Sequence, residues 1–189
     1  EMRIPLQVPG YQLKLSYFSP AGKVPAYRDG ELTVWDTLSI AEYLYESHPT
    51  LWPVDKAERA YARSGSAEMH SGFTAMRKAM PMNIRGRGRH IVTSPELEAD
   101  ITRIKTIWRD LRTQHADAGS WLFGAYSIAD AMFAPVVFRF LTYGVNGQGE
   151  VQELGEAEAG GQPQQPAGRR QQGGLGEEEN QDLAGRGSE

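Results

Sequence analysis

Cysteine is absent from the 189-residue chain. Its absence excludes a disulfide framework and any metal site built from thiolates, and it fits a reducing compartment. Long apolar runs are missing too: the run around FAPVVF is far shorter than the about 20 residues that cross a membrane as a helix. No signal-peptide pattern opens the chain, so the sequence predicts no association with a membrane.

A strong charge of either sign is also missing, because the formal net charge is only −4. Such a chain has no global attraction to nucleic acid or to an anionic surface. The basic stretch RGRGRH (residues 85–90) is short and has no interleaved aromatic residues, so we interpret it as a linker between helices. The four histidines are scattered without the spacing of metal ligands, and the sequence predicts no metal site.

Aromatic residues and isoleucine are absent from residues 146–189, where eleven of 44 residues are glycine and eight are glutamine. This segment carries −6 of the total charge, which leaves +2 for the first 145 residues. Such a composition cannot bury enough apolar area to offset the entropy of ordering, and it predicts a disordered tail. A genuine interaction tail and the product of a wrong reading frame or an unspliced segment are both open. At the other end the chain opens on Glu1 rather than Met, and we expect its natural start to lie upstream.

The stretch KVPAYRDGELTVWDTLSIAEYL combines a strand that begins with Val24-Pro25, a hairpin around Asp29-Gly30 and a helix capped by Asp36. If the Val24-Pro25 bond is cis, the backbone of Val24 faces outward and can pair with an extended peptide. The helix start after Asp36 offers free N–H groups and the positive end of a dipole, which suit a carboxylate. These two features together predict a site for an extended peptide that carries a carboxylate.

The rest of the first 145 residues reads as helical. A helix-forming stretch from Asp55 to Met80 contains Gly65 and Gly72 and carries an apolar stripe at spacings of four, three and four: Met69, Phe73, Met76 and Met80. Ser94 and Pro95 predict the start of a second helix. Ser127 with Asp130 forms a capping box for a third, in which Pro135 predicts a kink or an end.

In their order and spacing, KVPAYRDGELTVWDTLSIAEYL, LWP and YSIADAMFAP resemble the soluble, bacterial-type glutathione transferases over roughly residues 1–145. The resemblance implies an α/β plus all-α fold: an incomplete thioredoxin-like domain in residues 1–50, then an all-helical domain in residues 51–145. It also implies a cytoplasmic detoxification enzyme, a homodimer in the intact family member. Its co-substrate would be glutathione, with no metal, and its partner a small hydrophobic electrophile.

The resemblance assigns glutathione binding residue by residue. Val24 and Pro25 match the cis-proline loop that pairs with the cysteinyl backbone of glutathione. Asp36 and Thr37 match the acidic residue and hydroxyl that bind its γ-glutamyl end, although plain helix capping is an alternative role for Asp36. Lys23 would add positive charge near the glycyl end, or would be a solvated turn residue.

The catalytic residue is left unassigned. Family members carry a Ser, Tyr or Cys on a first strand and helix, whereas the 21 residues before Gly22 match in length only a second strand and an irregular segment. Ser16, Tyr17 and Ser19 fit the loop better than a catalytic position. We therefore expect the thiol-activating residue to be missing from this chain, which would leave the chain inactive. The alternative to a transferase is a non-catalytic binding or assembly domain with the same fold. The electrophile pocket is assigned to Met69, Phe73 and Met76, with helix-packing core as the competing interpretation.

Overall fold

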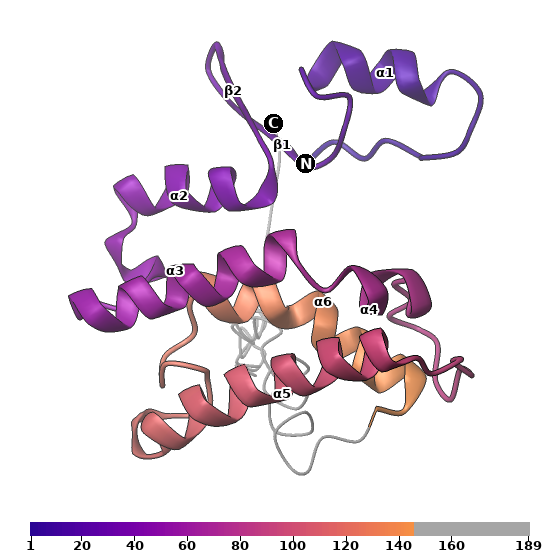
Figure 1. Cartoon of the computed structure of the whole chain (residues 1–189). Helices are drawn as coiled ribbons and strands as arrows, with labels where there is room; N and C mark the ends of the chain where they lie inside the picture. Colours follow the sequence, from indigo (N-terminus) through magenta and orange to yellow (C-terminus); the bar gives the residue numbers. More distant parts are fainter. Residues whose placement is uncertain (146–189) are drawn as a thin grey trace, which may run out of the picture.

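The computed structural model describes residues 1–145, and the predicted tail of residues 146–189 lies outside the described part of the chain. Figure 1 shows a smaller N-terminal part above a bundle of longer helices. The elements are α1 (Tyr11–Phe18), β1 (Ala26–Asp29), β2 (Leu32–Trp35), α2 (Thr37–Ser47), η1 (Pro49–Leu51), α3 (Lys56–Ser71), α4 (Thr74–Ala79), α5 (Pro95–Gln114), η2 (Ala116–Ala118) and α6 (Ile128–Tyr143). The predicted domain boundary at residues 50 and 51 falls inside η1 and stays a prediction.

The predicted hairpin is confirmed, with its turn one residue further along the chain. Strands β1 and β2 pair antiparallel, and the pair Asp29↔Leu32 closes a two-residue loop of Gly30 and Glu31. Gly30 has a φ of 57°, a left-handed conformation that costs a glycine little. Because Ala26 pairs with Trp35, Pro25 and Asp36 follow at the same open end of the hairpin.

The N-terminal segment differs from the expected strand and irregular segment, because it forms helix α1. The sequence YQLKLSYF has no Gly or Pro, and Leu, Lys and Gln are good helix formers. Gly10, with a φ of 79°, turns the chain into this helix. The expected strand rested on the length of the segment before Gly22, whereas the helix propensity of Tyr11–Phe18 decides its structure.

The helix predicted from Asp55 to Met80 is also divided. Helix α3 ends at Ser71 with Gly72 as its C-cap, and Phe73 then adopts a φ of 58° before α4 begins. Glycine is the residue that most often ends a helix, so Gly72 acts as the breaker while Gly65 stays inside α3. Pro135, in contrast to Gly72, does not end a helix, because α6 continues past it.

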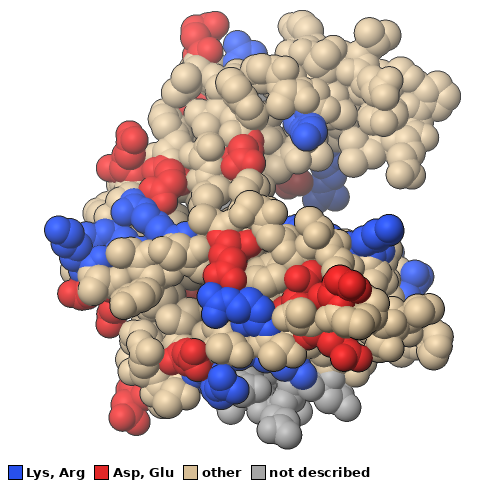
Figure 2. All heavy atoms as spheres, viewed as in Figure 1, with Lys and Arg blue, Asp and Glu red and all other residues tan. Residues whose placement is uncertain are grey.

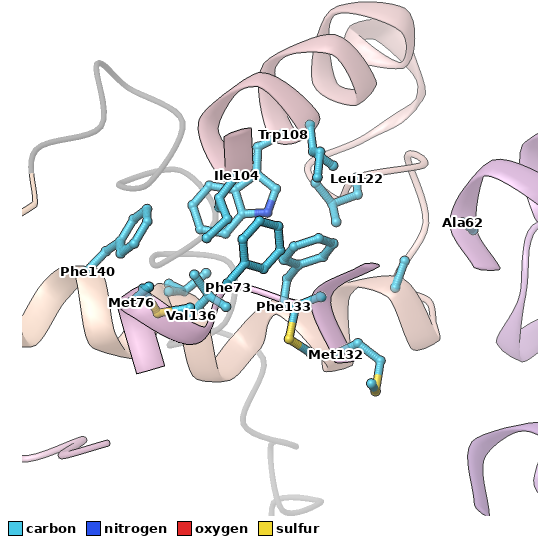
Figure 3. Close-up of a cluster of buried hydrophobic side chains, with 14 of the residues drawn as sticks. Ala62, Phe73, Met76, Ile104, Trp108, Leu122, Met132, Phe133, Val136 and Phe140 are labelled. Atoms are coloured by element: carbon cyan, nitrogen blue, oxygen red, sulfur yellow. The ribbon is translucent and has the colours of Figure 1, made fainter. Parts of the chain in front are cut away.

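The hydrophobic core lies in the helical part, where α3 packs along α6 and α4 packs on α5. Figure 3 shows side chains from α5 and α6 gathering around Trp108, which is fully buried and meets Phe133 and Phe140 edge to face. Figure 3 also places Phe73 and Met76 in this cluster. The core therefore fixes α3 and α4 against α5 and α6.

A polar cluster joins α2 to the helical part. The Glu42 carboxylate accepts hydrogen bonds from both the Nε and the Nη2 of Arg63, at 2.9 and 2.7 Å, and from the buried indole of Trp52 at 3.0 Å. The Arg63 guanidinium also lies over the rings of Tyr45 and Trp52. This cluster holds the N-terminal part on α3.

We expect Glu42→Ala to lower the free energy of unfolding by about 1–3 kcal/mol, because the indole N–H of buried Trp52 loses its acceptor. The ion pair itself adds little, since both its side chains are partly exposed. Urea denaturation of Glu42→Ala and of Glu46→Ala, an exposed glutamate on the same helix, measures the difference. Equal unfolding midpoints for the two variants would contradict the role given to Glu42.

Candidate functional site

The open end of the hairpin presents an unpaired backbone. The Val24-Pro25 peptide bond is cis, and Val24 is 53% exposed. Val24 lies outside the β1–β2 ladder, and its backbone makes no hydrogen bond to another described residue. Among the described residues β1 pairs only with β2, so an extended peptide can add to this end of the sheet.

Asp36 begins α2 in an unusual backbone conformation. Its φ of 74° is one that residues other than glycine rarely adopt, and such strain is often found at functional sites. The carboxylate Oδ1 accepts hydrogen bonds from the backbone N–H of Leu38 at 3.0 Å and of Ser39 at 3.3 Å. The predicted N-cap is therefore confirmed, and only Oδ1 takes part in it.

The other carboxylate oxygen of Asp36 contacts the helical part. The Nε2 of His70, at the C-terminal end of α3, lies 2.9 Å from Asp36 Oδ2, and both side chains are 39% exposed. Sequence reasoning left His70 as an ordinary surface or core histidine. Its position in the last turn of α3 gave no sign of this contact, which depends on how α2 sits over α3.

The remaining predicted glutathione-binding groups are exposed. The side chains of Lys23 and Thr37 form no ion pair or hydrogen bond with any described residue, and the backbone N–H of Lys23 donates to Ser19 Oγ at 3.4 Å. The hairpin register brings Pro25 and Asp36 to one end, with Lys23, Val24 and Thr37 beside them in the chain. This end of the hairpin thus offers a free ammonium, a free hydroxyl and a free backbone edge.

The three residues set aside as catalytic candidates differ in their surroundings. The Ser16 hydroxyl donates to the backbone carbonyl of Leu13 within α1, and Tyr17 is 79% exposed. Ser19 is only 2% exposed and caps the end of α1. None of these contacts assigns a catalytic role to the three residues.

The predicted electrophile-pocket residues lie in the core of the helical part. Met76 is fully buried, and Met69 and Phe73 are 5% and 7% exposed. Packing of the helices accounts for all three burials, and a role in binding an electrophile stays a prediction. In the part of the chain that the structure describes, no group of three or more histidine and carboxylate side chains could hold a metal ion. None of the described helices is long and apolar enough to span a membrane.

Comparison with known proteins gives one match by sequence. The chain is 40% identical over 62 residues to a probable maleylacetoacetate isomerase of Caenorhabditis elegans. The match covers 32% of this chain and 29% of that protein, so the chain spans less than a third of the length of its curated relative. No family model matches the chain.

Solved structures match over most of the chain. A glutathione transferase homologue from Burkholderia, solved with bound glutathione, superimposes with a TM-score of 0.57 at 22% identity over 82% of this chain and 75% of that one. Glutathione S-transferase 1-6 from Anopheles dirus species B superimposes with a TM-score of 0.64 at 14% identity, over 84% and 76% of the two chains. The described residues, an α/β part followed by an all-helical part, therefore have the fold of the glutathione transferases.

Proposed function

We propose that this chain binds glutathione at the open end of the hairpin and belongs to an enzyme that conjugates it to a small hydrophobic electrophile. The observation that carries the proposal is the meeting of the exposed Val24-Pro25 backbone with the capped start of α2 at Asp36 and Thr37. A similar fold in the Burkholderia homologue holds glutathione, which supports the same ligand here. A cytoplasmic location and a homodimer are part of this proposal.

Each end of the tripeptide finds a suitable group. The backbone N–H and C=O of Val24 pair with the cysteinyl residue as one more strand would. The γ-glutamyl carboxylate takes the backbone N–H and the hydroxyl of Thr37, because the N–H groups of Leu38 and Ser39 already donate to Asp36. The γ-glutamyl ammonium takes the Asp36 carboxylate. The Lys23 ammonium is left for the glycyl carboxylate.

The chemical step requires the thiolate of glutathione. A free thiol has a pKa of about 8.5, so a hydrogen-bond donor and a positive field at the sulfur are needed to favour the anion at neutral pH. The thiolate then attacks the electrophilic carbon, and the leaving group departs with its bonding electrons. We assign no residue among those described to thiol activation.

Calorimetric titration of glutathione into the full chain tests the binding site. Asp36→Ala is expected to weaken glutathione at least about tenfold, because it removes a charged partner of the γ-glutamyl ammonium. Asp55→Ala is the matched control: Asp55 caps α3 as Asp36 caps α2, and either substitution costs about 1 kcal/mol of stability by loss of the cap. Equal glutathione affinities in the two variants would contradict the proposed site.

A measurement of turnover distinguishes a glutathione transferase from a non-catalytic binding or assembly domain. Chloride release from 1-chloro-2,4-dinitrobenzene is followed with glutathione, with and without the protein. A rate above that of buffer supports the transferase. Glutathione binding without such a rate is the result expected of a non-catalytic binding or assembly domain.

A further inference from the structure

The two oxygens of the Asp36 carboxylate have different partners. Oδ1 accepts hydrogen bonds from the backbone N–H groups of Leu38 and Ser39, whereas Oδ2 lies 2.9 Å from Nε2 of His70. An ionised carboxylate only accepts hydrogen bonds, so Nε2 carries the proton and donates to Oδ2. A carboxylate has about four acceptor positions, two on each oxygen. The described residues leave one of them open, on Oδ2 beside His70.

His70 connects the start of α2 to the end of α3. Figure 1 shows α2 above α3, with the start of α2 over the C-terminal end of α3. Glu42, which binds Arg63, comes six residues after Asp36 and therefore about 9 Å further along the chain in helical geometry. The cluster of Glu42 and Arg63 thus holds the middle of α2, while His70 holds its first turn, where the proposed ligand binds.

The backbone that carries His70 is itself fixed. Arg77, on α4, donates from Nε to the carbonyl of Gly72 at 3.0 Å. Its Nη2 donates to the carbonyls of Met69 and, at 3.5 Å, His70. These carbonyls end α3, and a cation at the end of a helix is favourable. The imidazole of His70 therefore reaches Asp36 from a helix end that α4 holds in place.

The contact between His70 and Asp36 is open to solvent on one side. Each of the two side chains is 39% exposed. Figure 2 shows the surface hollowed between the N-terminal and helical parts, on the right of the view. A small ligand can therefore approach the junction of the two parts and reach the open acceptor position on Oδ2.

We propose that His70 is a positioning residue of this site: it fixes Oδ2 of Asp36, so that the site selects thiol peptides that carry a free γ-glutamyl ammonium. This inference rests on the proposed binding of glutathione. A carboxylate that is already held by three hydrogen bonds loses little further freedom when the ammonium binds, and such pre-organisation raises affinity. Without His70, Oδ2 would be free to bond water, and binding of the ammonium would have to order it.

The test compares two ligands that differ in one group. N-glutaryl-cysteinyl-glycine is glutathione without the α-amino group of its γ-glutamyl residue, so it cannot form the ammonium contact with Asp36. Calorimetry on the full chain is expected to give glutathione an affinity at least about tenfold higher than that of the glutaryl peptide.

Two substitutions of His70 separate the contact from the mere presence of a polar side chain. His70→Gln places an amide N–H near the position of Nε2, whereas His70→Asn places one near that of Nδ1, too far from Oδ2. His70→Asn is expected to weaken glutathione about five- to tenfold and to leave the glutaryl peptide unchanged. His70→Gln should keep most of the preference. His48→Asn is the matched control: it changes an exposed histidine at the other end of α2 and should bind as wild type does.

A purely structural role for His70 predicts different results. It would weaken both ligands equally in His70→Asn, and that equality would overturn the proposal. Similar glutathione affinities in wild type and His70→Asn, tighter binding in His70→Asn, or an equal loss in His70→Gln would overturn it as well. In an Asp36→Ala background His70→Asn should have no further effect on glutathione, because the contact through which it acts is gone.

Failure of the proposed function gives a separate result. If wild-type protein binds neither ligand, the glutathione site is refuted, and the role of His70 falls with it. If wild-type protein binds glutathione and His70→Asn, shown to be folded by urea denaturation, binds it equally well, only the role of His70 is refuted.

Discussion

Replacing Trp108 by alanine is expected to cost about 3–5 kcal/mol of unfolding free energy, as large-to-small substitutions of core aromatics do. Trp108 is fully buried, and its ring centroid lies 5.8 Å from that of Phe133 and 5.4 Å from that of Phe140. Removing the ring leaves a cavity between α5 and α6, the helices that surround it in Figure 3. Because domains are stable by only about 5–15 kcal/mol, urea denaturation should show a large fall in midpoint.

Two further variants separate packing from other causes. The Trp108 indole N–H is buried and has no hydrogen-bond partner among the described residues, so Trp108→Phe removes an unsatisfied donor along with part of the ring. It should therefore cost clearly less than Trp108→Ala. Trp35→Ala, at a side chain that is 45% exposed, should cost little. Similar losses for all three variants would refute the role given to the core contacts.

Replacing Asp130 by alanine is expected to cost about 3 kcal/mol, more than an ordinary helix cap. The carboxylate is 2% exposed and accepts three hydrogen bonds: from the backbone N–H of Leu122 at 2.9 Å, from that of Ser127 at 2.8 Å and from the Ser127 hydroxyl at 3.0 Å. Its removal leaves two buried backbone donors without an acceptor. Ser127→Ala removes only the hydroxyl and should cost about 1–2 kcal/mol. Chemical denaturation compares the two, and unchanged midpoints at unchanged slope would contradict the capping box.

The same carboxyl gives stability a dependence on pH. Burial raises the pKa of Asp130, against the hydrogen bonds from Leu122 and Ser127 that lower it. A raised pKa means that the folded state holds the proton more tightly than the unfolded chain, whose value is about 3.9. The contribution of this group is therefore present below about pH 3.9 and is lost as pH rises through the folded value. The stability difference between wild type and Asp130→Asn should fall with pH in that window, and a rise would refute the assignment.

The sequence by itself determined the local elements of this protein. Asp-Gly between alternating residues predicted the hairpin, and a polar side chain before an apolar run predicted the starts of α2, α5 and α6. These features depend on neighbours within a few residues, which a sequence pattern records directly. Where length was used in place of propensity, the prediction was wrong, because Tyr11–Phe18 forms a helix.

The tertiary structure alone decided which distant side chains meet. His70 and Asp36 lie on different elements, as do Arg63 and Glu42, and no spacing along the chain relates one member of a pair to the other. The surroundings of Met69, Phe73 and Met76 also depend on the tertiary structure. Helical periodicity predicts that one face of a helix is buried, but it does not identify the residues that pack against that face. In the structure, residues of α5 and α6 cover this face, because burying a contiguous apolar core stabilises the fold more than any single polar contact.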